Sequence, residues 1–139
     1  MIRSVLILLA LCSVAYSAEP RSVNFQTVLT DLDDKPMNWD CKVLSEDKKE
    51  CTEWRETTLA VVATTALMKQ WPNEELKVED QIRRTLLAQE IYKKMDVVLD
   101  SKDTDLLCTA IAKLITRANL STLITFRAIE LLDPARLKK

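Results

Sequence analysis

The sequence predicts a mainly α-helical protein, a small bundle of about four helices preceded by a short β-hairpin or extended arm. From residue 57 onward, apolar residues recur at the three-to-four spacing of amphipathic helices, whereas residues 22–29 alternate as in a half-buried strand. The chain of 139 residues contains no glycine, and tight turns between strands commonly need that residue. Helices joined by short polar connections of Asn, Asp, Pro and Ser therefore suit this composition better than a sheet with many turns.

The first residues have the organisation of a cleavable secretory signal peptide. A positive charge near the start precedes an apolar run over residues 5–14, and the small residues Ala15 and Ser17 precede a cleavage site before Ala18. The run is shorter than the ~20 residues needed to cross a bilayer. We therefore expect residues 1–17 to be removed and the mature protein to be exported, periplasmic or secreted, without stable membrane insertion after cleavage. A permanent membrane anchor is one alternative, and a lipoprotein attached through Cys12 is another, although Leu11 is not the small residue that usually precedes such a cysteine.

The remainder, residues 18–139, is predicted to form a single helical domain, because a chain of that length can bury a sufficient core without a metal. Residues 22–52 are expected to form an extended arm that contains a disulfide loop. Within the arm, residues 22–29 carry the strand signal, and a second short strand is expected before residue 51. The helices are expected over residues 57–133.

The first two helices are predicted from capping residues and apolar spacing. Thr57 or Thr58 is the expected N-cap of the first helix, and Pro72 ends it because proline lacks an amide donor and disfavours helical backbone before it. The second helix is expected over residues 78–95. Its predicted core stripe follows a spacing of three and four, and three further apolar residues broaden it: Val78, Ile82, Leu86, Ala88 or Gln89, and Tyr92, with Leu87, Ile91 and Met95. Its basic residues are predicted to face outward: Arg83, Arg84, Lys93 and Lys94.

The third helix is expected over about residues 103–118, with N-cap candidates among residues 100–103. Its core stripe is predicted to contain Leu107, Cys108, Ile111, Leu114, Ile115 and Ala118. Asn119 to Ser121 breaks the pattern, and Ser121 is the expected cap of a fourth helix over about residues 122–132, which stops before Pro134. That helix is predicted to pack through Leu123, Phe126, Ile129 and Leu132.

The cysteines predict one disulfide bond. Once the leader is removed, Cys41, Cys51 and Cys108 remain. Cys41 and Cys51 flank a short stretch whose polar half is typical of a turn, and in an oxidising compartment a bond between them would contribute on the order of 3 kcal/mol. Cys108 lies within an apolar helical pattern, where cysteine usually acts as a small hydrophobic residue. Three cysteines without histidine and without a Cys-x-x-Cys pair do not predict a metal site.

Composition argues against several classes of function. The absence of histidine removes the commonest general base and neutral metal ligand, and the absence of glycine excludes phosphate-binding and dinucleotide-binding loops. The net charge of −1 lacks the basic excess of nucleic-acid-binding domains. Asp31, Asp33 and Asp34 cluster in a predicted turn but lack the further ligands of a calcium loop. We expect no enzymatic activity, catalytic residue, cofactor, metal or nucleic-acid partner.

The three tryptophans are the candidate contacts for a protein partner. Trp39, Trp54 and Trp71 stand out in a chain with only 5% aromatic residues, and tryptophan is enriched among the residues that dominate binding energy at interfaces. The alternative is that they pack in the core or cover the disulfide arm. The sequence does not specify an oligomeric state.

Five segments outside the leader share the layout of a known group of proteins. They are Asn24–Thr27, Leu29–Pro36, Thr58–Leu59, Ala88–Tyr92 and Ala128–Pro134. In this layout the chain resembles small, mostly uncharacterised helical proteins of tailed phages and prophages, here with a secretory leader and a cysteine loop added. The resemblance covers nearly all of residues 22–135, through motifs of low specificity. It implies a role in modulating the host envelope, lysis timing or superinfection, and it carries over no site residues.

The sequence therefore leads to two hypotheses of function by contact, and to a third, less favoured one, a catalytic role through carboxylates such as Asp31 and Asp33. The first is an exported non-enzymatic protein that acts by protein–protein contact in the bacterial envelope or periplasm and is possibly phage-encoded. The alternative is a secreted inhibitor or effector of a foreign enzyme, in which the loop over residues 41–51 is the presented element.

Secretion is tested by the mass of the exported product under non-reducing conditions. The full-length sequence is expressed in a bacterium, and the periplasmic or secreted protein is measured by intact mass spectrometry. We expect the mass of residues 18–139 less two hydrogens, because the leader is removed and one disulfide forms. A full-length, fully reduced mass in the intracellular fraction would contradict both expectations.

Overall fold

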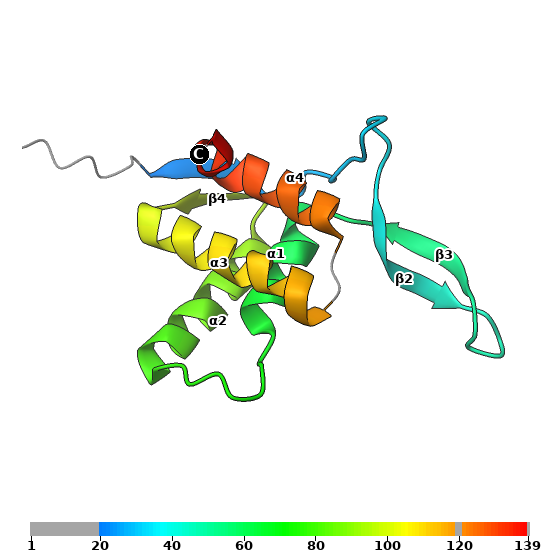
Figure 1. The fold of residues 1–139 in the computed structure, drawn as a ribbon, viewed down its shortest axis with the longest axis horizontal. Coiled ribbons are helices and arrows are strands. Elements are labelled where there is room, and N and C mark those ends of the chain that lie inside the picture. Colours follow the sequence, from blue (N-terminus) through cyan, green and yellow to red (C-terminus); the bar gives the residue numbers. More distant parts are fainter. Residues whose placement is uncertain (1–19, 119–120, 139) are drawn as a thin grey trace, which may run out of the picture.

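The computed structural model describes residues 20–118 and 121–138 and has four helices after short antiparallel strands, which confirms the predicted fold class (Figure 1). In chain order the elements are β1 (Arg21–Asn24), β2 (Asn38–Leu44), β3 (Cys51–Glu56), α1 (Leu59–Met68), α2 (Val78–Lys93), β4 (Asp96–Leu99), α3 (Ser101–Ala118), α4 (Thr122–Leu132) and a 3₁₀ turn at Pro134–Lys138. The predicted leader and the predicted break at Asn119 and Leu120 lie outside the described residues.

The helix α1 forms the centre of the bundle, as its apolar composition predicts. It packs against both α2 and α3, and α4 covers α3 on another side (Figure 1). Five of its side chains are buried: Leu59, Val62, Ala63, Ala66 and Leu67. The helix ends at Met68, four residues before Pro72, and its C-cap is Lys69. From α3, the predicted residues Leu107, Cys108, Ile111 and Leu114 complete this core.

The start of α1 is capped both locally and by a distant segment. Thr58, one of the two predicted caps, accepts a hydrogen bond on its hydroxyl from the Val61 amide at 3.3 Å. The amides of Leu59 and Ala60 donate to backbone carbonyl groups of residues 27 and 25 at 2.9 and 2.8 Å. Amides in the first turn of a helix have no partner within the helix. The segment after β1 therefore supplies the acceptors that α1 needs.

The predicted strand over residues 22–29 is shorter than expected and pairs with a strand that the sequence did not predict. β1 ends at Asn24 and runs antiparallel to β4, with Val23 opposite Val97. Val23, Val97 and Leu99 are buried against the helices. Residues 21–24 thus belong to the body of the domain and not to an extended arm, because their apolar side chains complete the helical core. The hairpin of this protein is instead β2–β3.

The predicted core stripe of α2 was right for Leu87, Ala88 and Ile91, which are buried, and wrong for the rest of its apolar residues. Four large apolar residues of the predicted stripe are more than half exposed: Val78 66%, Ile82 54%, Leu86 60% and Tyr92 82%. The opposite side enters the core through Arg84, Leu87, Ala88 and Ile91. Arg84 was expected to face outward but is only 6% exposed. Its guanidinium lies 3.4 Å from Glu74, whose carboxylate also binds Lys113 at 3.0 Å, and this pairing compensates the charge inside the fold.

The caps and packing faces of the last two helices agree only partly with the sequence. Asp100 accepts a hydrogen bond from the Asp103 amide at 2.7 Å, so α3 begins at Ser101, two residues earlier than expected. This hydrogen bond is the main cause that lowers the pKa of the Asp100 carboxyl, and the nearby Arg83 guanidinium lowers it as well. In α4, Ser121 occupies the cap position without a side-chain hydrogen bond. Its buried residues are Ile124, Thr125, Ala128 and Leu132, whereas the predicted Phe126 is 43% exposed.

The buried thiol of Cys108 predicts a measurable pH dependence. Its side chain is 1% exposed, and burial raises the pKa of the thiol to about 11 from an ordinary 9.0. Because the folded state retains this proton between pH 9 and 11 and the unfolded state loses it, the free energy of unfolding should fall as pH rises through that window. Urea unfolding at pH 8 and pH 10.5 measures the free energy of unfolding of the wild type and of Cys108→Ala. Its fall between the two pH values should be larger for the wild type.

The reactivity of Cys108 provides the control. A thiol reagent should not modify native protein at pH 8 but should modify it once urea unfolds the chain. Rapid modification of the native protein, or an identical pH response in Cys108→Ala, would contradict the assignment of Cys108 as a buried neutral thiol.

Candidate functional site: the disulfide-linked hairpin

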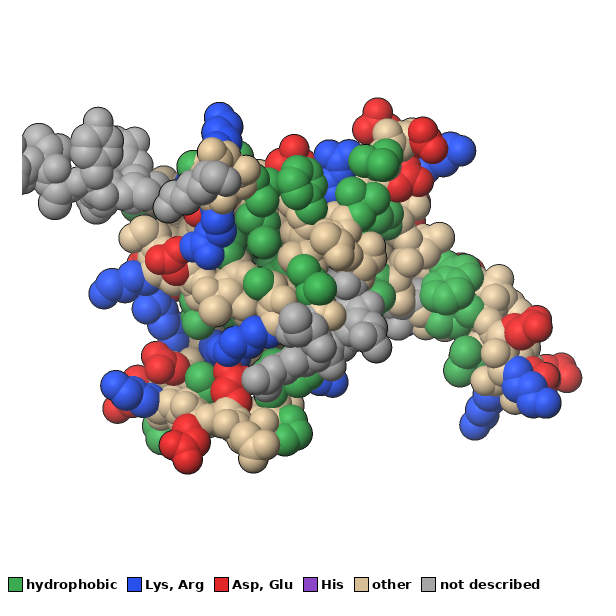
Figure 2. All heavy atoms as spheres, in the orientation of Figure 1, with side chains coloured by type: hydrophobic (Ala, Val, Ile, Leu, Met, Phe, Trp, Pro, Cys, Tyr) green, Lys and Arg blue, Asp and Glu red, His purple; other side chains and the backbone are tan. Residues whose placement is uncertain are grey.

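The hairpin β2–β3 projects from the helical body. Its two strands run antiparallel and contact each other far more than they contact any helix (Figure 1). Figure 2 shows the same projection as a narrow extension, with Lys, Arg, Asp and Glu side chains gathered toward its far end and hydrophobic side chains nearer the body. An isolated two-stranded hairpin is marginally stable in water. Its shape therefore depends on further bonds, which are found in three places: the disulfide, the turn and the base of the hairpin.

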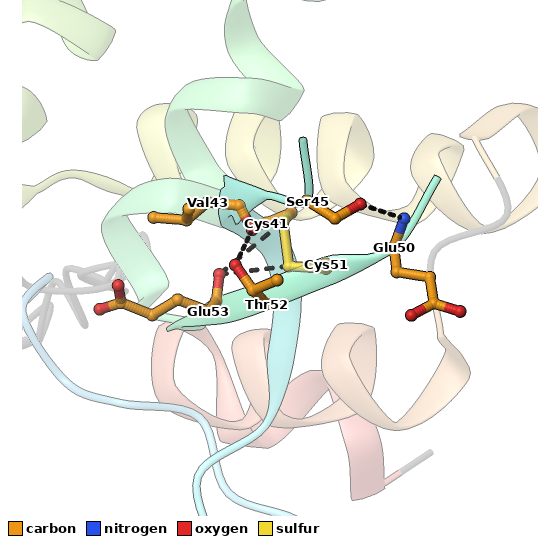
Figure 3. The surroundings of a disulfide bond; sticks show 7 residues. All are labelled: Cys41, Val43, Ser45, Glu50, Cys51, Thr52 and Glu53. Carbon is orange, nitrogen blue, oxygen red and sulfur yellow. Dashed lines mark hydrogen bonds between the residues drawn. A yellow bond between two sulfur atoms is a disulfide. The ribbon is translucent and has the colours of Figure 1, made fainter. Parts of the chain in front are cut away.

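The first of these is the predicted disulfide bond, which the structure confirms. Cys41 on β2 and Cys51 at the start of β3 are joined, with their Cα atoms 5.8 Å apart (Figure 3). The strands are irregular here, with a register shift on either side of Val43. The Thr52 hydroxyl donates to the Val43 carbonyl oxygen at 3.0 Å and bridges this irregular stretch (Figure 3). The disulfide thus closes the hairpin where the strand ladder is weakest.

The second is a turn built without glycine. The Ser45 amide donates to the Glu50 carbonyl oxygen at 2.8 Å. In return, the Glu50 amide donates to the Ser45 hydroxyl oxygen at 3.1 Å (Figure 3). Lys48 takes the left-handed backbone conformation, with φ of 58°, that glycine would usually provide. Asp47 accepts hydrogen bonds from the Ser45 hydroxyl and the Lys49 amide, which lower the pKa of its carboxyl. Side-chain acceptors therefore replace glycine in shaping the turn.

The third is the base of the hairpin, which is tied to the body through backbone bonds. The Thr57 amide donates to Met37, the Met37 amide to Leu29, and the Leu29 amide to Thr57, all onto carbonyl oxygens at 2.8 to 2.9 Å. From α4, the Arg127 guanidinium donates to the carbonyl oxygens of Thr30 and residue 31 at 3.1 and 3.2 Å. The direction of the hairpin relative to the helices is set at this point.

The structure places the three predicted tryptophans in different surroundings. Trp54 lies on β3 and is 52% exposed, whereas Trp39 on β2 is half-buried and packs against the core. Trp71 lies in the connection after α1, where it also packs against the core, with the Lys69 ammonium 5.5 Å from its ring centre. Only Trp39 and Trp54 therefore belong to the hairpin. Val43 and Leu44, which sequence reasoning did not select, are 43% and 54% exposed on β2.

The helical body offers less for chemistry. A pocket of about 180 Å³ lies near Arg21, Leu99 and Leu132, and is smaller than the roughly 300–1,000 Å³ typical of small-molecule sites. Residues 31–35 form the expected acidic turn, in which the Asp31 carboxylate accepts hydrogen bonds from two backbone amides. Within the described part of the chain, no group of three or more His, Cys, Asp or Glu is placed to hold a metal ion.

Over residues 20–118 and 121–138, no helix combines the length and the apolar character needed to span a membrane.

Comparison of the chain with protein-family models, with curated proteins and with solved structures gives no match. The resemblance to phage and prophage proteins accordingly stays a prediction from the sequence.

Removing the disulfide should loosen the hairpin and leave the helical body intact. In the double variant Cys41→Ser/Cys51→Ser, the loss of a constraint worth about 3 kcal/mol should speed amide exchange over residues 41–51 by up to about 100-fold. Hydrogen exchange with mass spectrometry measures this, and the far-ultraviolet circular dichroism of the helices serves as the internal control. A large loss of helical signal would show that the hairpin and the body unfold as one unit.

Proposed function

We propose that this protein is an exported, non-enzymatic binding protein that acts by protein–protein contact in the bacterial envelope or periplasm, with the β2–β3 hairpin as its contact element. The observation that carries the proposal is the exposure of Trp54, Leu44 and Val43 on an element that stands apart from the core. Exposed apolar side chains gathered on a projecting element are typical of interaction sites.

The construction of the hairpin favours binding to a protein surface. A disulfide and a hydrogen-bonded turn hold its shape before any partner arrives, which reduces the entropy lost on binding. Its strands form a two-stranded sheet, so each has an outer edge whose backbone groups are available to a strand of a partner. Trp54 supplies an aromatic anchor, and the charged residues near the turn supply a polar rim.

Two features support the proposed compartment. The disulfide is of the kind that persists in oxidising surroundings such as the periplasm or the extracellular space. The signal-peptide pattern of residues 1–17 provides the route to such a compartment. The resemblance to phage and prophage proteins extends the proposal to a phage-encoded factor that acts on the host envelope.

The same hairpin also fits the alternative of a secreted inhibitor or effector of a foreign enzyme. The favouring observation is its narrow shape: two strands closed by a disulfide and a six-residue turn from Ser45 to Glu50. A rigid loop of this form can enter a cleft on another protein. Loss of activity of a hydrolase on addition of the protein, and not on addition of Trp54→Ala, would favour this alternative.

Photocrosslinking tests the binding role of the hairpin. A photoreactive phenylalanine derivative replaces Trp54 in the chain expressed with its leader in a bacterium, and a matched variant carries it at Leu32, which is 82% exposed on the acidic turn. We expect a defined protein adduct from position 54 and none from position 32. In the purified complex, Trp54→Ala should weaken binding by at least about ten-fold, as for a central interface tryptophan. Equal adducts at both positions, or none from position 54, would contradict the proposal.

A further inference from the structure

The helix α2 is apolar on two opposite sides, and only one of them is used in the fold. Leu87 and Ile91 enter the core, whereas Val78, Ile82 and Tyr92 lie on the other side and are 66%, 54% and 82% exposed. The outward side of a surface helix is normally polar. This second stripe runs nearly the whole length of a 16-residue helix, and a patch of that extent marks an interaction site.

Charges along one flank of this stripe indicate what covers it. Glu79, Leu86 and Lys93 are spaced by seven residues and therefore follow one line along the helix. Glu79 lies in the first turn and Lys93 in the last turn. Within the described chain, neither of these two forms an ion pair. The line is thus negative at one end, apolar at its centre and positive at the other end.

Such a line of residues is complementary to the same line on a second copy of the protein when the two helices run in opposite directions. With Leu86 on the two-fold axis, Glu79 of each copy lies opposite Lys93 of the other copy, and the two Leu86 side chains meet. The same alignment brings Ile82 near Tyr92 of the other copy. A parallel arrangement would instead place like charges together, which is unfavourable. A two-fold contact must be made by the same surface on both subunits, and this stripe meets that requirement.

We propose that the exposed face of α2, defined by Val78, Ile82, Leu86 and Tyr92, is the interface of an antiparallel homodimer. The helix lies at the edge of the bundle, on the opposite side of the body from β2 and β3, so both hairpins stay free in the dimer (Figure 1). A single 16-residue helix is about 24 Å long. It buries less than the ~800 Å² per partner of a standard interface, so the dimer is expected to be weak, with a Kd on the order of 10 µM.

Sedimentation equilibrium of the protein purified from expression of the full-length sequence tests this proposal. Over a concentration range of roughly 1 to 500 µM, the average mass should rise from that of a monomer to that of a dimer. Glu79→Lys and Lys93→Glu should each weaken the dimer by about ten-fold, because each creates two like-charge pairs. The double variant Glu79→Lys/Lys93→Glu reverses both signs and should restore the wild-type Kd.

Two further variants locate the interface. Leu86→Asp should abolish dimerisation, because it places two carboxylates on the axis, whereas Leu32→Asp on the exposed acidic turn should leave the Kd unchanged. Trp54→Ala should also leave it unchanged, so this test stands apart from that of the hairpin. A monomer over the whole concentration range, a dimer insensitive to Leu86→Asp, or failure of the double charge reversal to restore the dimer would overturn the proposal.

Discussion

The segment from Phe25 to Leu29 is the constraint on which the rest of this structure depends. Phe25 and Leu29 are essentially buried, at 0% and 1% exposure, and the backbone between and around them bonds in three directions. The Phe25 amide donates to Met95 beside β4, the carbonyl oxygens of residues 25 and 27 accept from the first amides of α1, and Leu29 exchanges bonds with residues at the base of the hairpin. One buried stretch thus joins strand, helix and hairpin, because a buried backbone must find partners for its polar groups.

This arrangement divides the protein into two parts with different sources of stability. The helical body depends on apolar burial around α1 and α3, which is the dominant stabilising contribution in a domain of this size. The hairpin buries little and depends on a disulfide, a side-chain-bonded turn and the bonds at its base. An element that is stiff yet separate from the core can change its surface residues without cost to the stability of the fold, as is common for loops held by a scaffold.

The two proposed contact surfaces lie on different parts of the molecule and would act together. A dimer formed through α2 would carry two hairpins, and a second binding event on the same partner assembly would be intramolecular. Effective concentrations in the millimolar range can then raise overall affinity by about two to four orders of magnitude without any new contact. A weak dimer and a modest hairpin contact would therefore be sufficient, as proposed, for firm attachment to a repeated or clustered target.

The sequence by itself determined the features that arise from neighbours along the chain. The caps at Thr58 and Asp100, the helical periods and the Cys41–Cys51 pairing over a short loop all follow from local hydrogen bonding and spacing. Only the tertiary structure decided which side of α2 is buried, because both sides are apolar and Glu74, ten residues earlier, neutralises Arg84. It also decided that β1 pairs with β4 and that Trp54 is exposed while Trp39 is half-buried. These outcomes depend on contacts between distant segments, whose partners the local pattern does not specify.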